Sequence, residues 1–169
     1  MIKVRKLKII LWIFIVLLIQ TVVISQLRIP GAVPSLVLVY TICVMIMENE
    51  FRNAVIISII CAVCFGALCD RGFVPTSLFY VYSSIVVFAL RKKPQYVRNP
   101  IKAFAWVFIA SGASEIMYFI LNTFTINIDM LTNHALPTAV CNTVLAFIVY
   151  PLLRITMYRE EKKKTLLVV

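Results

Sequence analysis

The chain has 169 residues, of which 62% are hydrophobic and only 14% are charged, and its formal net charge is +10. Soluble domains carry roughly 25% charged residues, and a soluble protein of this length could not bury so much apolar surface. The apolar residues also come in long blocks rather than in the periodic stripes of amphipathic helices. These properties exclude an ordinary soluble domain and predict an all-α integral membrane protein.

Six apolar segments are long enough to be transmembrane helices, since a helix needs about 20 apolar residues to cross ~30 Å of hydrocarbon. The first segment begins like a secretory signal, but it stays apolar beyond the length of a signal core, so we expect a retained span. Charges and turn residues interrupt the chain between the segments. They predict one transmembrane domain over residues 1–169 with spans at 9–27, 32–48, 53–70, 73–91, 102–122 and 136–157.

The lysine and arginine residues predict the orientation. With a cytoplasmic N-terminus, Arg28 and Arg71 are the only ones of the 17 basic residues that fall on the outer side. The positive-inside rule therefore predicts six spans with both termini in the cytoplasm. The positive charge is explained by this topology and by attraction to anionic lipid at the cytoplasmic face. No basic surface interleaved with aromatic residues is left for nucleic acid.

Two short stretches lie near span ends. Pro34 is expected to open the second span, where its missing N–H group costs nothing. Glu48 and Glu50 stand on a cytoplasmic turn before Arg52, and we expect both carboxylates to be solvated.

The third span ends in residues 61–72, CAVCFGALCDRG, which contain three cysteines. Cys61 and Cys64 share a helix face, and in a soluble protein this spacing suggests zinc or redox chemistry. A structural zinc site needs four deprotonated ligands, which would be costly inside hydrocarbon, whereas a free cysteine packs as a small hydrophobic residue. We therefore expect packing here, with no metal and no cofactor.

Asp70 lies at the outer end of the same span. Charged residues near membrane depth usually have a partner. Gly66, four residues earlier, allows close approach of another helix, and Gly72 permits a tight turn. Two interpretations remain open for Asp70, namely a partner contact and an ordinary helix end at the water boundary.

Glu115 is the most conspicuous polar residue of the fifth span, and a cluster of small residues precedes it. An acid at that depth must be protonated, hydrogen-bonded, or turned toward a watery cavity or a partner. We expect a buried polar contact, in this chain or to a partner. The second interpretation is an outer-side pocket lined by Asp70, Arg71, Trp106, Glu115 and Asn122.

The chain carries no enzyme signature. It has no nucleophile elbow, no phosphate-binding glycine loop and no metal-binding helix motif. Its single histidine, His134, falls in the predicted loop between the last two spans. We therefore expect no catalytic residues and a protein that is not an enzyme.

A family resemblance rests on the six-span layout and on two motifs. Pro34 leads the second span, and the third span ends in Gly-x-x-x-Asp, Gly66 to Asp70, with an apolar fourth span directly after it. This pattern resembles the bacterial rod shape-determining protein MreD family. Family members often carry Asp after the proline, where this chain has Ser35. The resemblance implies a membrane fold similar to the substrate-binding subunits of energy-coupling-factor transporters.

The resemblance also implies a function. A member would be a non-enzymatic scaffold of the bacterial cytoplasmic membrane that binds the bitopic protein MreC. Through MreC it would join RodA, a class B penicillin-binding protein and the actin-like MreB filament in peptidoglycan synthesis and cell-shape control. The alternative is a subunit of an energy-coupling-factor-type transporter that binds a small solute. An intramembrane enzyme is the third and weakest interpretation.

Overall fold

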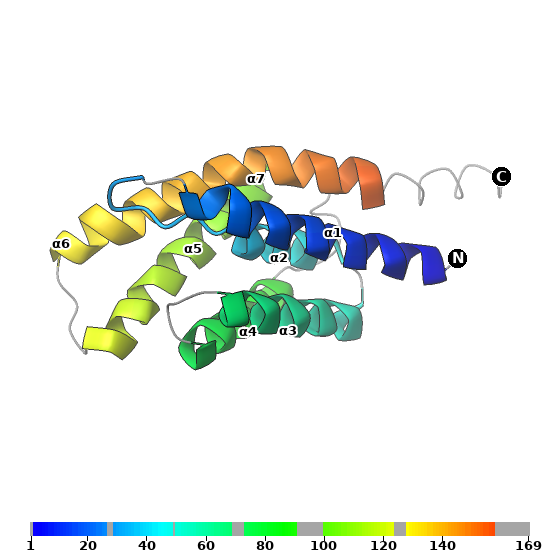
Figure 1. Ribbon diagram of the computed structural model, residues 1–169, viewed down its shortest axis with the longest axis horizontal. Helices are drawn as coiled ribbons and strands as arrows, with labels where there is room; N and C mark the ends of the chain where they lie inside the picture. The colour runs from blue at the N-terminus through cyan, green and yellow to red at the C-terminus, as the bar shows by residue number, and fades with distance from the viewer. Residues whose placement is uncertain are drawn as a thin grey trace.

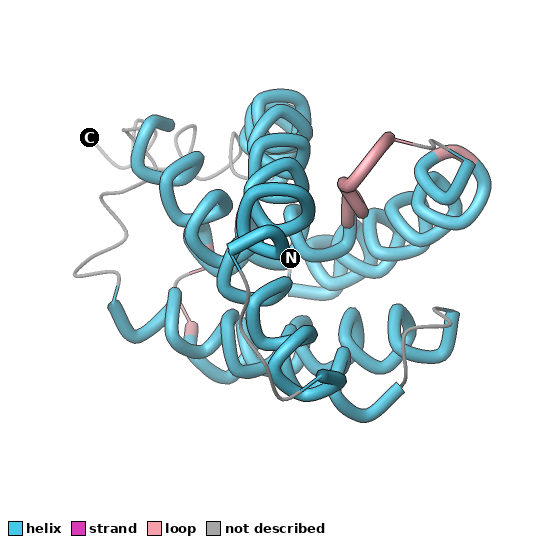
Figure 2. Tube along the Cα trace, turned by 90° about the vertical axis from the view of Figure 1, so that its left-hand side faces the viewer, coloured by secondary structure: helices cyan, strands magenta, loops and turns pink. Residues whose placement is uncertain are grey.

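The computed structural model describes residues 2–26, 29–48, 50–68, 73–90, 100–123 and 128–157, and over these ranges the protein is helical without a strand (Figures 1 and 2). The predicted all-α class is therefore confirmed. In chain order the elements are α1 (Ile2–Val22), the 3₁₀ turn η1 (Ile24–Gln26), α2 (Leu36–Met47), α3 (Phe51–Leu68), α4 (Phe73–Leu90), α5 (Pro100–Thr123), α6 (Ile128–Met130), the π-helical turn η3 (Leu131–Ala135) and α7 (Leu136–Met157).

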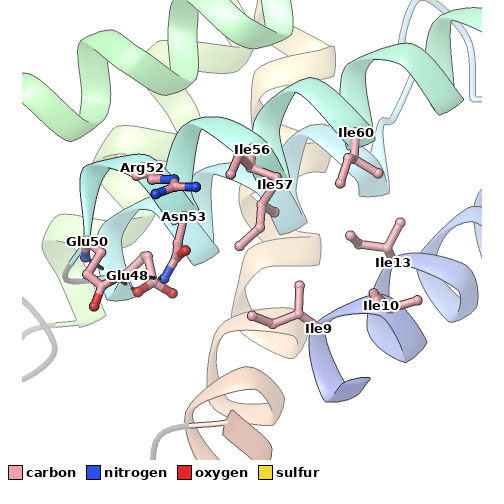
Figure 3. A pocket seen from close by; sticks show the side chains of 10 residues that line it. All are labelled: Ile9, Ile10, Ile13, Glu48, Glu50, Arg52, Asn53, Ile56, Ile57 and Ile60. Carbon is pink, nitrogen blue, oxygen red and sulfur yellow. Dashed lines mark hydrogen bonds between the residues drawn. The ribbon is translucent and has the colours of Figure 1, made fainter. Parts of the chain in front are cut away.

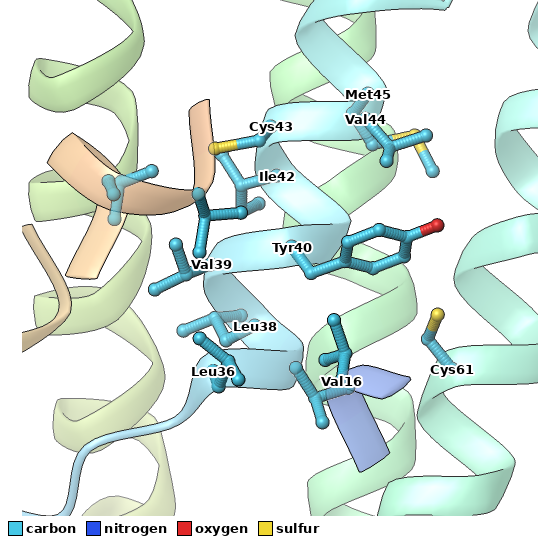
Figure 4. Close-up of a cluster of buried hydrophobic side chains, with 14 of the residues drawn as sticks. Val16, Leu36, Leu38, Val39, Tyr40, Ile42, Cys43, Val44, Met45 and Cys61 are labelled. Atoms are coloured by element: carbon cyan, nitrogen blue, oxygen red, sulfur yellow. The ribbon is translucent and has the colours of Figure 1, made fainter. Parts of the chain in front are cut away.

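Helix α2 forms the centre of the molecule. All of its residues are buried, and it contacts α1, α3, α4, α5 and α7. Its side chains point to all sides of the helix axis (Figure 4). A helix that is apolar all round must be covered all round, and the hydroxyl of Thr41, the one Ser or Thr within it, donates to the Val37 carbonyl at 2.7 Å.

Tyr40 shows how the neighbouring helices close around α2. Its ring lies near Val16 of α1 and Cys61 of α3 (Figure 4), and all three side chains are buried. The Tyr40 hydroxyl reaches the Ile9 carbonyl of α1 at 3.5 Å. The tyrosine thus fills the space between two surrounding helices, and its buried hydroxyl has a hydrogen-bond acceptor there.

Two helical stretches among the described residues, Pro100–Leu121 and Ile128–Thr156, are long and apolar enough to cross a membrane. The other apolar helical stretches, Lys8–Val22, Leu36–Met47, Phe51–Ala67 and Tyr80–Leu90, are shorter. The predicted span 32–48 is observed as an extended segment followed by α2, whose 12 residues extend about 18 Å. By length and composition the two long stretches fit a membrane protein.

The loop predicted between the last two spans is wrong from Ile128 onward. The described residues from Ile128 are helical and continue through the π-helical turn into α7, while residues 124–127 lie outside the described part. The sequence LTNHA contains neither Gly nor Pro, so nothing in it stops a helix, and a π-helical turn accommodates an extra residue. His134 therefore lies in a helical turn, with its ring 5.4 Å from that of Phe119 on α5.

Pro151 does not end the last helix, which continues to Met157. It lacks the N–H group that would reach the Phe147 carbonyl, so α7 loses one backbone hydrogen bond there. The first helix, in contrast, ends before its predicted limit, at Val22.

Gly31 is required where the segment before α2 meets the π-helical turn. Its φ is +74°, and a Cβ atom built on it would collide with the backbone carbonyl oxygen of Asn133. We expect Gly31→Ala to lower the free energy of unfolding by more than about 1 kcal/mol, because it adds backbone strain to this clash. Denaturant unfolding of the detergent-solubilised protein measures the change.

Gly112→Ala is the matched control. A Cβ atom at Gly112 would lie 3.9 Å from the Ala139 Cβ, an ordinary contact, and alanine is favoured over glycine inside a helix by about 1 kcal/mol. This variant should therefore be as stable as the parent or more so. Equal stability of the two variants would contradict the close approach at Gly31.

Candidate functional site

A buried polar network surrounds the start of α2. Ser35 caps the helix, and its Oγ accepts a hydrogen bond from the Leu38 backbone N–H at 3.2 Å. The backbone N–H of Ser35 donates to Asn142 Oδ1 of α7 at 2.7 Å. The Ser35 and Tyr80 hydroxyls lie 2.6 Å apart. Serine is a preferred N-cap, and here it also ties α2 to α4 and α7.

The segment before α2 is held by two further side chains. Gln20 of α1 accepts from the Leu36 N–H with its Oε1 at 2.6 Å and donates from its Nε2 to the Pro34 carbonyl at 3.3 Å. Thr138 of α7 accepts from the Val33 N–H at 3.0 Å. The first N–H groups of a helix have no partner within it, so side chains of α1 and α7 supply the acceptors that buried backbone needs.

The network extends to the remaining helices. Asn142 Nδ2 donates to Ser111 Oγ of α5 at 3.1 Å. The Tyr80 carbonyl accepts from Ser84 Oγ of α4 at 2.5 Å and, at 3.5 Å, from Ser58 Oγ of α3. These side chains are hydroxyls and a carboxamide. Such neutral groups fix the relative positions of helices through directional bonds.

The first predicted motif meets this network. Pro34 is buried and precedes the cap, so its expected position in the first helical turn is wrong, since α2 begins only at Leu36. Gly66 is buried in α3, and its neighbour Phe65 packs its ring 5.0 Å from that of Tyr80. Tyr80 therefore contacts the residue after Pro34 and the residue before Gly66, namely Ser35 and Phe65, which the sequence pattern did not indicate. Asp70, Arg71 and Gly72 lie outside the described residues.

Of the five residues predicted to line an outer-side pocket, the structure describes the side chains of two. Glu115 is buried on α5, as expected of a deep polar residue, and Trp106 is half-buried against the hydrophobic core. They are nine residues apart on one helix, which places them about 14 Å apart along its axis and on opposite sides of it. These two side chains therefore do not converge on one pocket. Asn122 belongs to α5, but its side chain is outside the described part.

The four described cysteines are spread over α2, α3 and α7, and Cys69 lies outside the described residues. Cys43 and Cys61 are buried, and Cys64 and Cys141 are half-buried, all as free thiols. Within the described ranges, His, Cys, Asp and Glu side chains form no group of three or more that could hold a metal ion. Cys61 lies in the same hydrophobic cluster as Tyr40.

A cavity of about 460 Å³ lies between α1 and α3 (Figure 3). Its polar end is formed by Glu48, Glu50, Arg52 and Asn53. The expectation of a solvated Glu48 is wrong, because its exposed fraction is 0%. Glu48 is the C-cap of α2, with its N–H bonded to the Val44 carbonyl at 2.8 Å, so the burial of α2 extends to it. The unbroken apolar run before Glu48 was the signal that could have indicated this.

Asn142 offers a test of the network. Asn142→Leu leaves the Ser35 N–H without its acceptor, and a buried unsatisfied group costs about 1–3 kcal/mol, so we expect a loss of unfolding free energy of that size. Thr143→Val is the control on the same helix, because Thr143 Oγ1 donates within α7, to the Ala139 carbonyl. Chemical unfolding monitored by circular dichroism compares the two variants. A loss as large for Thr143→Val as for Asn142→Leu would count against the network.

Two features are thus available for function, namely a neutral buried network at the start of α2 and a cavity with charged groups at its end. No protein-family model, curated protein or solved structure matches this chain. The case for a function therefore depends on the chain's own residues and geometry.

Proposed function

We propose that this protein is a non-enzymatic scaffold of the bacterial cytoplasmic membrane, similar to MreD, that binds an MreC-like bitopic protein. Through this partner it would link RodA, a class B penicillin-binding protein and MreB to cell-wall synthesis and cell shape. The observation that carries the proposal is that polar and apolar side chains occupy different parts of the molecule. The network side chains bond to one another and to the backbone around α2, while the outer faces of the surrounding helices expose large apolar side chains.

These outer faces form stripes. On α1 and on α7, exposed apolar residues recur every four positions, so that consecutive members are neighbours on the helix surface and each row winds gradually around its helix. Exposed apolar surface of this extent marks contact with a membrane or with another protein. The stripes consist of Ile10, Phe14, Leu18 and Val22 on α1, and of Leu136, Val140, Val144, Ile148 and Leu152 on α7.

The arrangement of the helices supports the six-span topology that we propose. The start of α1 and the end of α7 lie at the same end of the molecule (Figure 1), as a protein with both termini in the cytoplasm requires. The start of α3, with Arg52, lies at this end too (Figure 1). Basic residues at this end agree with the positive-inside rule.

The short α2 is compatible with a membrane location. Non-helical backbone at membrane depth is tolerated only where protein or water satisfies its polar groups. Gln20, Thr138 and Asn142 perform this task for residues 33–36. Ser35 stands where MreD-like chains often carry Asp, and both residues are preferred N-caps, so the substitution preserves the capping role.

The solute-binding alternative receives less support. A solute captured from outside needs a pocket on the outer side. The cavity between α1 and α3 is instead lined by Glu48 and Arg52, at the end where α1 begins, which is cytoplasmic in the proposed topology.

A pull-down in mild detergent tests the scaffold. We expect the tagged full-length chain to recover a bitopic membrane protein with a large outer domain, identified by mass spectrometry, because binding such a partner is the proposed scaffold role. Retained small molecules are measured in the same sample. Recovery of a solute together with an ATPase module would instead establish the transporter alternative and overturn the scaffold.

A complementation experiment tests the Gly-x-x-x-Asp motif. In a strain depleted of the protein, Asp70→Ala should impair cell shape more than the double variant Cys61→Ala, Cys64→Ala, because we assign partner contact to Asp70 and packing to the cysteines. Membrane levels of both variants are compared by immunoblot. Equal complementation at equal levels would remove Asp70 from the proposed contact.

A further inference from the structure

The walls of the cavity between α1 and α3 are two matching sets of isoleucines. Each helix contributes three at positions i, i+1 and i+4, a spacing that gathers them on one face. The two sets lie across the cavity from each other (Figure 3). Isoleucine is β-branched and stiff at χ1, so these side chains do not readily rotate into the space between them. They are Ile9, Ile10 and Ile13 of α1, and Ile56, Ile57 and Ile60 of α3.

The cavity has a closed floor and an open side. Ile13 and Ile57 are 7% and 5% exposed and form the floor, whereas Ile10, Ile56 and Ile60 are exposed along the mouth. The cavity is therefore an apolar groove that opens sideways. In a protein that spans a membrane, as we propose here, this mouth faces hydrocarbon, and its volume of about 460 Å³ is within the range of small-molecule sites.

One end of the groove is polar and contains charges of both signs. Glu50 and Arg52 are exposed there, and Asn53 is half-buried. Asn53 Nδ2 donates to Glu50 Oε2 at 2.8 Å, which orients the carboxylate. The Glu50 backbone N–H reaches Glu48 Oε1 at 3.5 Å, so the covered Glu48 supports the turn that carries Glu50. The rim thus presents a carboxylate and a guanidinium beside an apolar channel.

We propose that this groove binds a phospholipid whose headgroup carries a primary ammonium group. The acyl chain lies between the two isoleucine sets, the ammonium contacts the Glu50 carboxylate, and the phosphate contacts the Arg52 guanidinium. Guanidinium groups suit phosphate because they donate to two oxygens at once. This site goes beyond the scaffold function and depends only on membrane insertion, which is part of that proposal.

The charges select among lipid headgroups. An anionic headgroup without an amine can offer its phosphate to Arg52, but it has no cation for the Glu50 carboxylate. A choline headgroup has a cation but no N–H donor, whereas a primary ammonium donates up to three hydrogen bonds. The groove should therefore differ from the basic flanks of the chain, which attract anionic lipid in general.

Native mass spectrometry of the detergent-purified full chain tests the site. The chain is mixed with equal amounts of phosphatidylethanolamine, phosphatidylcholine and phosphatidylglycerol that share the same acyl chains. We expect one phosphatidylethanolamine per chain, retained at least about threefold more than either competitor, as a single partly exposed charge pair allows.

Three variants test whether the preference for phosphatidylethanolamine depends on residues of the groove. Glu50→Gln preserves the side-chain shape and an acceptor for Asn53 but removes the charge, so phosphatidylethanolamine should fall to the level of phosphatidylcholine. Asp129→Asn is the control, because it removes an exposed acid from α6, outside the groove, and should retain the preference. Ile56→Trp at the mouth should lower the binding of all three lipids. Thermal unfolding confirms that each variant remains folded.

Several results would overturn the site. If phosphatidylglycerol is retained most, the lipid binding is explained by general attraction to the basic flanks and not by the groove. If phosphatidylethanolamine and phosphatidylcholine are retained equally, the proposed contact between the ammonium group and Glu50 is wrong. A preference that persists in Glu50→Gln would place the lipid elsewhere.

The partner pull-down on the same preparations separates the two proposals. A chain that recovers its bitopic partner without preferring phosphatidylethanolamine overturns the lipid site alone, and the reverse result overturns the scaffold alone.

Discussion

The burial of α2 on every side is the constraint on which the rest of the structure depends. A helix without a polar face must be covered by neighbours, and the N–H groups at its start must then find acceptors away from water. Asn142 of α7, Gln20 of α1 and the capping Ser35 supply them. An unsatisfied buried group costs about 1–3 kcal/mol. These bonds therefore favour the one arrangement of α1 and α7 around α2 in which every such group has its partner.

The two ends of α2 serve different purposes. At its start the neutral network joins the helices through Ser35 and Tyr80, and we assign to it the relative placement of the helices in the proposed scaffold. At its other end the burial of α2 continues into Glu48, which supports the turn that brings Glu50 and Arg52 to the rim of the groove. The same helix therefore organises both the buried centre and the proposed lipid site.

Much of the local structure could be predicted. The helical class and the helices near 53–70, 73–91 and 102–122 followed from apolar blocks bounded by charges and turn residues. The loop predicted before the last helix is wrong from Ile128 onward, because the polar residues around His134 include neither Gly nor Pro and do not interrupt the helix. Glu115 was expected to be buried and is buried, but the nine residues of helix between it and Trp106 place the two side chains on opposite sides of α5.

By itself, the sequence determined the helical class, the approximate helix bounds and the basic residues that predict an orientation, because these depend on neighbours along the chain. Only the tertiary structure decided that α2 is central, since the apolar segments look alike when each is read alone. It also decided that Asn142 caps a segment more than 100 residues away and that two isoleucine sets face each other across a groove. Such pairings depend on how distant helix surfaces fit together, and no periodicity along the chain encodes them.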